Sequence, residues 1–117
     1  MKFLCIVYGC DGPTGEPAEH PSEMMTAVLT NNRELQDAGH LIASSPLQPA
    51  STAVTVQVRR DEVTITDGPF AETKEQVGGF YLIEADSMKQ AVELTAAMPP
   101  AQIGAIEVRA LNELPVL

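Results

Sequence analysis

Two segments of this chain are apolar on both faces of the strands that they are expected to form, and this pattern constrains the fold most strongly. Side chains alternate between the two faces of a strand. In residues 2–8 one face carries Phe3, Cys5 and Val7, and the other face carries Leu4, Ile6 and Tyr8. In residues 77–85 one face carries Tyr81 and Ile83, and the other face carries Phe80 and Leu82. A sheet that contains both strands needs an apolar cover on each face.

The first of two predicted helices spans residues 22–38. Ser22 is a good N-cap residue, and Glu23 places a negative charge at the positive end of the helix dipole. Gly39 is a natural C-terminal stop. Apolar side chains recur at three- and four-residue spacing and predict one buried face, made of Met24, Met25, Val28, Leu29, Leu35 and Ala38.

The second predicted helix begins after Ser87 and ends near Met98. Ser87 and Gln90 have the spacing of a capping box, in which both side chains bond backbone N–H groups of the first turn. Pro99 and Pro100 end the helix, because the residue before a proline is restricted to extended conformations. The expected apolar face consists of Met88, Ala91, Val92 and Thr95.

The remaining strands are expected at residues 40–47, 53–58, 62–66 and 103–111, with residues 59–61 as the turn of a hairpin. The order is β-α-β-(ββ)-β-α-β. It predicts one α+β domain over residues 1–117, a ferredoxin-like sandwich with both helices on one face of a mainly antiparallel sheet. Gly78 and Gly79 permit a bulge, or a close approach of another backbone, at the start of the strand over residues 77–85.

Two helices cover one face of such a sheet, so the second apolar face needs another cover. A second copy of the chain is the economical answer, and twofold dimers are the commonest oligomers. The sequence therefore predicts a homodimer.

The charge balance argues against two classes of partner. The chain has 16 acidic and 7 basic residues, a net charge of −9, whereas nucleic acids and anionic membranes are bound through cations. No apolar run reaches the ~20 residues that span a bilayer, and the apolar start of the chain is too short for a signal peptide. We expect a cytoplasmic protein without nucleic-acid or membrane partners.

Residues 67–75, which read DGPFAETKE, hold the first candidates for a site. Asp67 is in phase with Val63 and Ile65, so it lies at the end of an apolar face, where a carboxylate can accept or donate a proton. Asp before Gly-Pro is also a common turn residue whose side chain bonds the following amides. Both roles are compatible.

Other residues of this stretch have a functional and a structural interpretation. Glu72 and Lys74 form a charge pair that binds a polar ligand, or they belong to a solvated turn. Phe70 lines a pocket or anchors the turn into the core.

The last strand adds Glu107 and Arg109, two residues apart and therefore on one face. They form an ion pair across a dimer interface, or Arg109 binds a carboxylate substrate. Tyr8 ends the first strand, where its hydroxyl reaches a cleft or packs in an interface.

Histidines and cysteines carry weaker signals. His40 is a general base or a partner of the helix C-terminal carbonyls. His20 lies near Asp11, Glu16, Glu19 and Glu23, but the spacing fits no familiar metal site, and no metal is expected. Cys5 is expected to be a buried small hydrophobe and Cys10 a loop thiol. No dinucleotide or phosphate-loop motif is present, so no cofactor is expected.

The DGPFAETKE string, placed before a Gly-Gly strand, resembles the signature of the DGPF-domain family within the YCII-related group. The similarity extends to the segments GGFYLIE at 78–84 and GAIEVR at 104–109 and to the first strand, so it covers essentially the whole chain. The resemblance implies a bacterial protein that forms a dimeric α+β barrel from two ferredoxin-like sheets. For some relatives it implies a regulatory or stress setting.

Two functions follow as hypotheses. One is a dimer that binds a small anionic or aromatic molecule, with Tyr8, Phe70, Glu72, Lys74, Glu107 and Arg109 as ligand-binding residues. The other is a cofactor-independent lyase, isomerase or dehydrochlorinase-like enzyme with Asp67 as its acid and base. Related dehydrochlorinase-like enzymes use a His–Asp pair, and this chain has no His in its first strand. Whether the protein is an enzyme stays open from the sequence.

Overall fold

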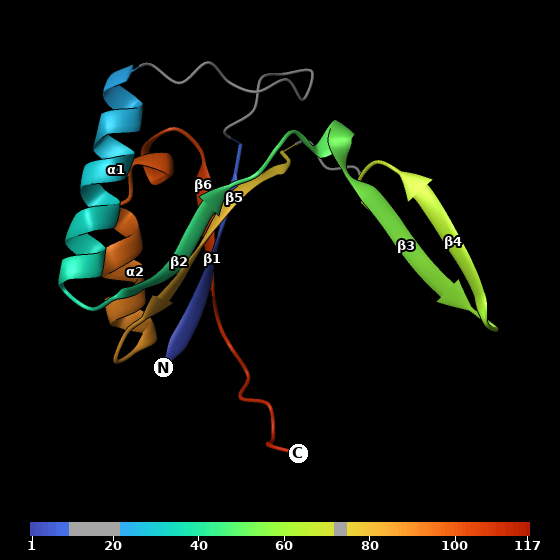
Figure 1. Ribbon diagram of the computed structural model, residues 1–117. Helices are drawn as coiled ribbons and strands as arrows, with labels where there is room; N and C mark the ends of the chain where they lie inside the picture. The colour runs from blue at the N-terminus through green and yellow to red at the C-terminus, as the bar shows by residue number, and fades with distance from the viewer. Residues whose placement is uncertain (10–21, 72–74) are drawn as a thin grey trace.

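The computed structural model describes residues 1–9, 22–71 and 75–117, which form a helix-covered sheet and a projecting hairpin (Figure 1). The sheet contains β1 (Lys2–Tyr8), β2 (Leu41–Pro46), β5 (Val77–Glu84) and β6 (Ala105–Ala110). Their order is β2-β5-β1-β6, and every neighbouring pair is antiparallel. This is the predicted ferredoxin-like α+β arrangement.

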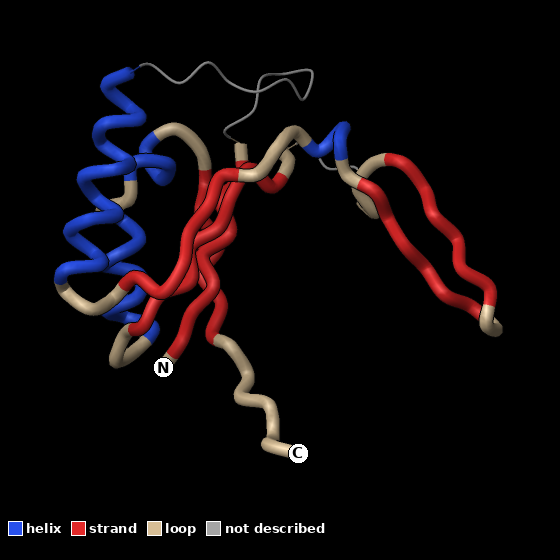
Figure 2. The backbone as a smooth tube through the Cα atoms, in the orientation of Figure 1, coloured by secondary structure: helices blue, strands red, loops and turns tan. Residues whose placement is uncertain are grey.

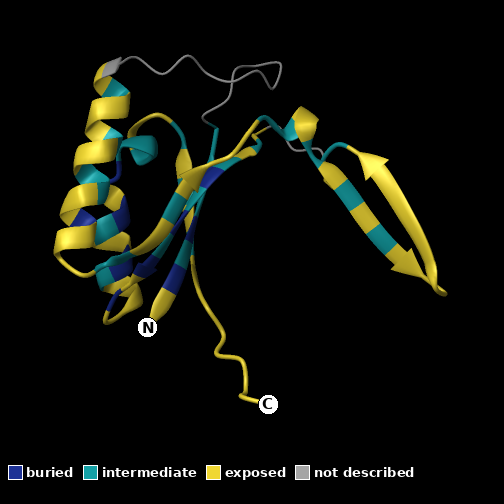
Figure 3. Ribbon diagram, viewed as in Figure 1, coloured by how far each residue is buried: buried dark blue, intermediate teal, exposed yellow. Residues whose placement is uncertain are grey.

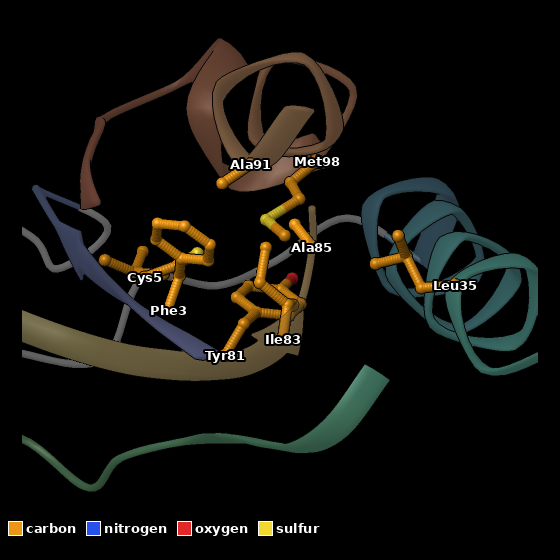
Figure 4. Packing of buried hydrophobic residues seen from close by; sticks show 9 residues of the cluster. Phe3, Cys5, Leu35, Tyr81, Ile83, Ala85, Ala91 and Met98 are labelled. Atoms are coloured by element: carbon orange, nitrogen blue, oxygen red, sulfur yellow. The ribbon is translucent and has the colours of Figure 1, made fainter. Parts of the chain in front are cut away.

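Both helices, α1 (Ser22–Asp37) and α2 (Met88–Ala96), lie on the same side of the sheet (Figure 2). The core between them and the sheet consists of alternate residues of the central strands, with Phe3, Cys5 and Ile83 fully buried. Met98, which follows α2, and Leu35 of α1 belong to the same cluster of buried residues (Figure 4). No helix in the described residues combines the length and apolarity needed to cross a bilayer.

The predicted Ser87 cap of α2 is confirmed, whereas the Gln90 side chain bonds the residue before Ser87 and not Ser87 itself. The Ser87 side chain accepts the backbone N–H of Gln90 at 3.1 Å, and the Gln90 side-chain oxygen accepts the N–H of Asp86 at 2.7 Å. The predicted apolar face is only partly correct, because Ala91 and Thr95 are buried while Met88 and Val92 are exposed. Met98, which lies just before a 3₁₀ turn, η2 (Pro99–Gln102), is fully buried in the core instead.

The apolar face predicted for α1 is mostly not buried. Leu35 is buried, but Met25 and Leu29 are exposed, and Met24 and Val28 are half-buried. The helix ends as predicted: Gly39 has φ +78°, and the N–H of His40 bonds the carbonyl of Leu35 at 2.8 Å. The helix therefore packs through its C-terminal half.

The second face of the sheet, which we call the open face, is apolar as the strand pattern predicted. Leu4 pairs with Leu82 and Ile6 with Phe80 across β1 and β5, and all four are half-buried. Neither α1 nor α2 lies on this side (Figure 2). The protomer by itself thus leaves one apolar face of its sheet without a second layer in the described residues.

The hairpin forms a separate two-stranded sheet, β3 (Val54–Arg59) with β4 (Glu62–Asp67), and we call it the arm. Arg60 and Asp61 have φ of +49° and +65°, as the two central residues of a tight hairpin turn require. A short 3₁₀ turn, η1 (Ala50–Thr52), leads into it. None of its residues is classed as buried, and it projects away from the main sheet (Figure 3).

One face of the arm is apolar and exposed. Val56 lies opposite Ile65 and Val58 opposite Val63, and these side chains are 54–67% exposed. Because a lone two-stranded hairpin is marginally stable in water, this face is suited to packing against another surface.

Cys5 is fully buried under α2, as expected from the sequence. Its thiol lies 3.5 Å from the Thr95 hydroxyl, which itself donates to the Ala91 carbonyl at 2.7 Å. Removal from water raises the pKa of the Cys5 thiol, and the contact with Thr95 lowers it by less.

We predict that Cys5 makes the stability pH-dependent in alkali. Above pH ~8.5 the unfolded thiol ionises while the folded one keeps its proton, so the folded state binds more protons and stability falls as pH rises. Urea unfolding of Cys10→Ser and Cys5→Ala/Cys10→Ser at pH 7 and pH 10 checks this. The double variant should lose less stability over this interval, and equal losses would contradict the prediction.

Candidate functional site

A largely apolar cavity of about 190 Å³ lies between α1 and the sheet. The N-terminal half of α1 forms its roof through Met24, Met25, Val28 and Leu29. The gap exists because this half of the helix is not packed down on the strands, as the exposed Met25 and Leu29 show.

The floor of the cavity is built by β2 and by the start of β5. Val7 pairs with Gly79 and Tyr8 with Val77, so Gly78 is an extra residue in β5, the bulge that the Gly-Gly pair predicted. A Cβ on Gly79 would lie 3.0 Å from the Ser45 carbonyl oxygen. The absent side chain lets β2 approach closely, so both predicted uses of this pair are confirmed.

Few polar groups reach the cavity. Asn32 of α1 and Ser44 and Ser45 of β2 line it, together with Tyr81, Pro100 and Ile103. Its described lining contains no Asp, Glu, Lys, Arg or His. The site thus favours an uncharged, mostly apolar molecule with a small number of hydrogen-bonding groups.

The end of the 67–75 stretch is fixed to the end of β1. The N–H of Gly9 bonds the Gln76 carbonyl at 3.3 Å, and a Cβ on Gly9 would meet the Glu75 carboxyl carbon at 3.4 Å. Gly9 also has φ +76°. This part of the stretch is therefore architectural.

Asp67 lies at the end of β4 on the apolar face of the arm, in phase with Val63 and Ile65 as predicted, and it is exposed. The turn after it is held by the N–H of Gly68, which bonds the Ala53 carbonyl at 2.7 Å. The Thr55 hydroxyl also donates to the Gly68 carbonyl at 2.8 Å. Asp67 does not line the cavity of its own protomer.

The other predicted site residues are not gathered at the cavity. Phe70 is 78% exposed, so within one protomer it neither lines a pocket nor anchors the turn. Glu72 and Lys74 lie outside the described residues. The site proposed from the 67–75 stretch is thus not assembled within the described part of a single chain.

Glu107 and Arg109 contact each other within β6 of one chain, with Nε of Arg109 3.4 Å from the Glu107 carboxylate. They lie opposite Ile6 and Leu4, on the open face of the sheet. Arg109 is 74% exposed, so this ion pair contributes little to the stability of one protomer. Tyr8, half-buried at the end of β1, is also on this face.

The histidines show no catalytic arrangement among the described residues. Nδ1 of His40 lies 2.8 Å from the Glu84 carbonyl, so the expected carbonyl partner belongs to a neighbouring strand and not to the end of α1. His20 and its acidic neighbours Asp11, Glu16 and Glu19 lie outside the described residues. In the described ranges, His, Cys, Asp and Glu do not gather in a group of three that could hold a metal ion.

Asn32, Ser44 and Ser45 are polar cavity residues that the sequence analysis did not single out. The sequence alone does not show what surrounds an asparagine inside a helix, because its environment depends on how α1 lies over the sheet. One signal in the sequence could have identified Asn32 as a cavity residue. It follows Val28 by four residues, about one turn, and so lies on the helix face that was expected to be apolar.

Comparison with known proteins shows family and fold. The family profile described as "YCII-related domain" matches residues 1–115. An uncharacterized protein, R00369, from Rhizobium meliloti (strain 1021) is 36% identical over 114 residues, which are 95% of this chain and 92% of that protein.

A solved structure has a similar fold. It is a 5-chloro-2-hydroxyhydroquinone dehydrochlorinase, TftG, from Burkholderia phenoliruptrix AC1100, in complex with 2,5-dihydroxybenzoquinone. The TM-score is 0.54 at 18% identity, with 96% of this chain and 94% of that chain covered. At 18% identity the similarity shows that the two proteins share a fold, and it does not show that they catalyse the same reaction.

Proposed function

The chain belongs to the YCII-related domain family, and we propose that it acts as a homodimer that binds a small molecule in the cavity beneath α1. The observation that carries the binding role is the cavity itself: a largely apolar space whose lining includes the polar residues Asn32, Ser44 and Ser45, held between a loosely packed helix and a bulged strand. Such sites bind small ligands in many proteins.

Two unpaired apolar surfaces support the dimer. The open face presents Leu4, Ile6, Phe80 and Leu82, and the arm presents five β-branched residues that nothing in the described chain covers. Exposed apolar patches of this kind are characteristic of protein interfaces. In the proposed dimer the two sheets pack by their open faces and each arm packs against the partner.

We predict that the protein runs as a particle of twice its 12.5 kDa mass in size-exclusion chromatography with light scattering. Ile65→Lys places a charge on the apolar face of the arm and should shift the equilibrium toward monomer. Thr64→Lys, on the opposite face of the same strand, is the matched control and should leave the dimer intact. A stable wild-type monomer at micromolar concentration would exclude the dimer.

We predict that one-ring compounds raise the Tm by binding in the cavity, since a ligand that binds only the folded state stabilises it. A suitable panel includes phenol, toluene, benzoate and 2,5-dihydroxybenzoquinone, the last because the structural neighbour was solved with it. Val28→Trp fills the cavity and should abolish the shift, whereas Val92→Trp, exposed on α2, should not.

The Arg109→Ala variant distinguishes binding in this cavity from binding of an anion by Arg109, which the sequence suggested. Arg109 lies on the open face, away from the cavity lining, so binding in the cavity should survive its loss. If the ligand-induced rise in Tm is lost in Arg109→Ala but kept in Val28→Trp, the ligand binds at the open face, and the proposed cavity site is wrong.

A cofactor-independent lyase or isomerase remains a second candidate because of where Asp67 lies. It shares the apolar face of the arm with Val63 and Ile65, so packing of that face on a partner would remove this carboxylate from water. A desolvated carboxylate is suited to proton transfer.

For this candidate we predict that Asp67→Asn keeps the Tm and the dimer mass but abolishes turnover of a panel of hydroxylated ring substrates, measured by absorbance. The amide keeps the shape of the side chain and cannot exchange the proton. If the folded variant turns over a substrate as fast as wild type, Asp67 has no place in the mechanism.

A further inference from the structure

The two serines of β2 direct their side chains to opposite faces of the sheet. Ser44 lies opposite Tyr81 in the pairing of β2 with β5, and Ser45 lies opposite Phe80. Residues directly opposite each other in antiparallel strands have side chains on the same face. Tyr81 belongs to the buried core on the helical side. Ser44 therefore points to the side that holds the cavity, and Ser45 points to the open face.

The hydroxyl of Ser44 is available to a molecule in the cavity. It makes no hydrogen bond to another described residue, whereas the Ser45 hydroxyl donates to the Pro46 carbonyl at 2.8 Å. In the described chain, the enclosed side-chain oxygens without a partner are those of Asn31 and Asn32, and the Ser44 hydroxyl is not among them. Ser44 is half-buried and lines the cavity, so its hydroxyl is both unpaired and accessible.

The surroundings of this hydroxyl indicate what kind of molecule it would meet. The roof opposite β2 is apolar, with Met24, Val28 and Leu29, and the described lining contains no charged side chain. A charged ligand would lose its hydration here without gaining a counter-ion, which is strongly unfavourable. The volume is about 190 Å³, and an engineered apolar cavity of about 150 Å³ in another protein takes up benzene. The space therefore suits one ring with a small substituent.

We propose that Ser44 is a specificity-determining residue whose hydroxyl hydrogen-bonds the hydroxyl group of an uncharged one-ring ligand. This inference rests on the proposed binding function and deepens it. The ring occupies the apolar space under α1, and its hydroxyl group lies against β2. A serine hydroxyl both donates and accepts, so it satisfies a ligand hydroxyl that would otherwise be buried without a partner.

Phenol and toluene are the probes, because they differ by a hydroxyl in place of a methyl group. Their dissociation constants are measured by calorimetry at pH 7 for wild type, Ser44→Ala and Ser45→Ala. The ratio of the toluene constant to the phenol constant should fall about fivefold in Ser44→Ala, as for the loss of one net hydrogen bond. The ratio should stay unchanged in Ser45→Ala, the matched control, because that hydroxyl is on the other face and already bonded.

A second pair of variants separates the hydroxyl from the shape of the side chain. Ser44→Thr and Ser44→Val add the same volume to the cavity wall, and only threonine keeps the hydroxyl. Both residues are well tolerated in strands. Ser44→Thr should keep the wild-type ratio of the two dissociation constants, and Ser44→Val should show the fall seen in Ser44→Ala. A merely structural role of Ser44 would change the affinity for both probes alike and leave the ratio unchanged.

The outcomes distinguish this inference from the function on which it rests. If both probes bind wild type and the ratio is the same in Ser44→Ala and Ser44→Val, Ser44 does not recognise the ligand hydroxyl and the inference is wrong. It is also wrong if benzoate, the charged analogue, binds wild type as tightly as phenol. If neither probe binds wild type at millimolar concentration, the proposed cavity function fails and the inference fails with it.

Discussion

The antiparallel pairing of β1 with β5 is the constraint on which the rest of the structure depends. Each strand is apolar on both faces, so their pairing creates two apolar surfaces from a single hydrogen-bonded ladder. Phe3, Cys5 and Ile83 are removed from water by the helices and by Met98. The opposite surface stays open, and this asymmetry connects the stability of one protomer to the proposed assembly.

The helical cover is itself incomplete, and its gap is where we place the binding site. Helix α1 is anchored by Leu35 near its C-terminal end, while its N-terminal half stands over the Gly78–Gly79 bulge. The same loose packing explains why the apolar face predicted for α1 is only partly buried. A better packed helix would be more stable and would leave no space for a ligand.

The site and the assembly surfaces are separate within the protomer. The cavity lies on the helical side of the sheet, while Glu107, Arg109 and Tyr8 lie on the open face and Asp67 lies on the arm. Residues 67–75 combine a turn at Gly68 with an anchor at Gly9, so the described part of this stretch has structural roles in one chain. Tyr8, Glu107, Arg109 and Asp67, which stood out in the sequence, therefore lie on the open face and the arm and do not line the cavity.

The sequence by itself determined the element order, the capping of α2, the bulge at Gly78 and the apolar character of both sheet faces. Each of these features depends on the chemistry of a few neighbouring residues or on the alternation of side chains along a strand. Both can be recognised from a short stretch of sequence. Only the tertiary structure decided that Met98 is buried while Val92 is exposed, that the N-terminal half of α1 leaves a cavity above the sheet, and that Asn32 and Ser44 line this same cavity. These depend on the distance between a helix and strands far apart in the chain, and no local pattern encodes that distance.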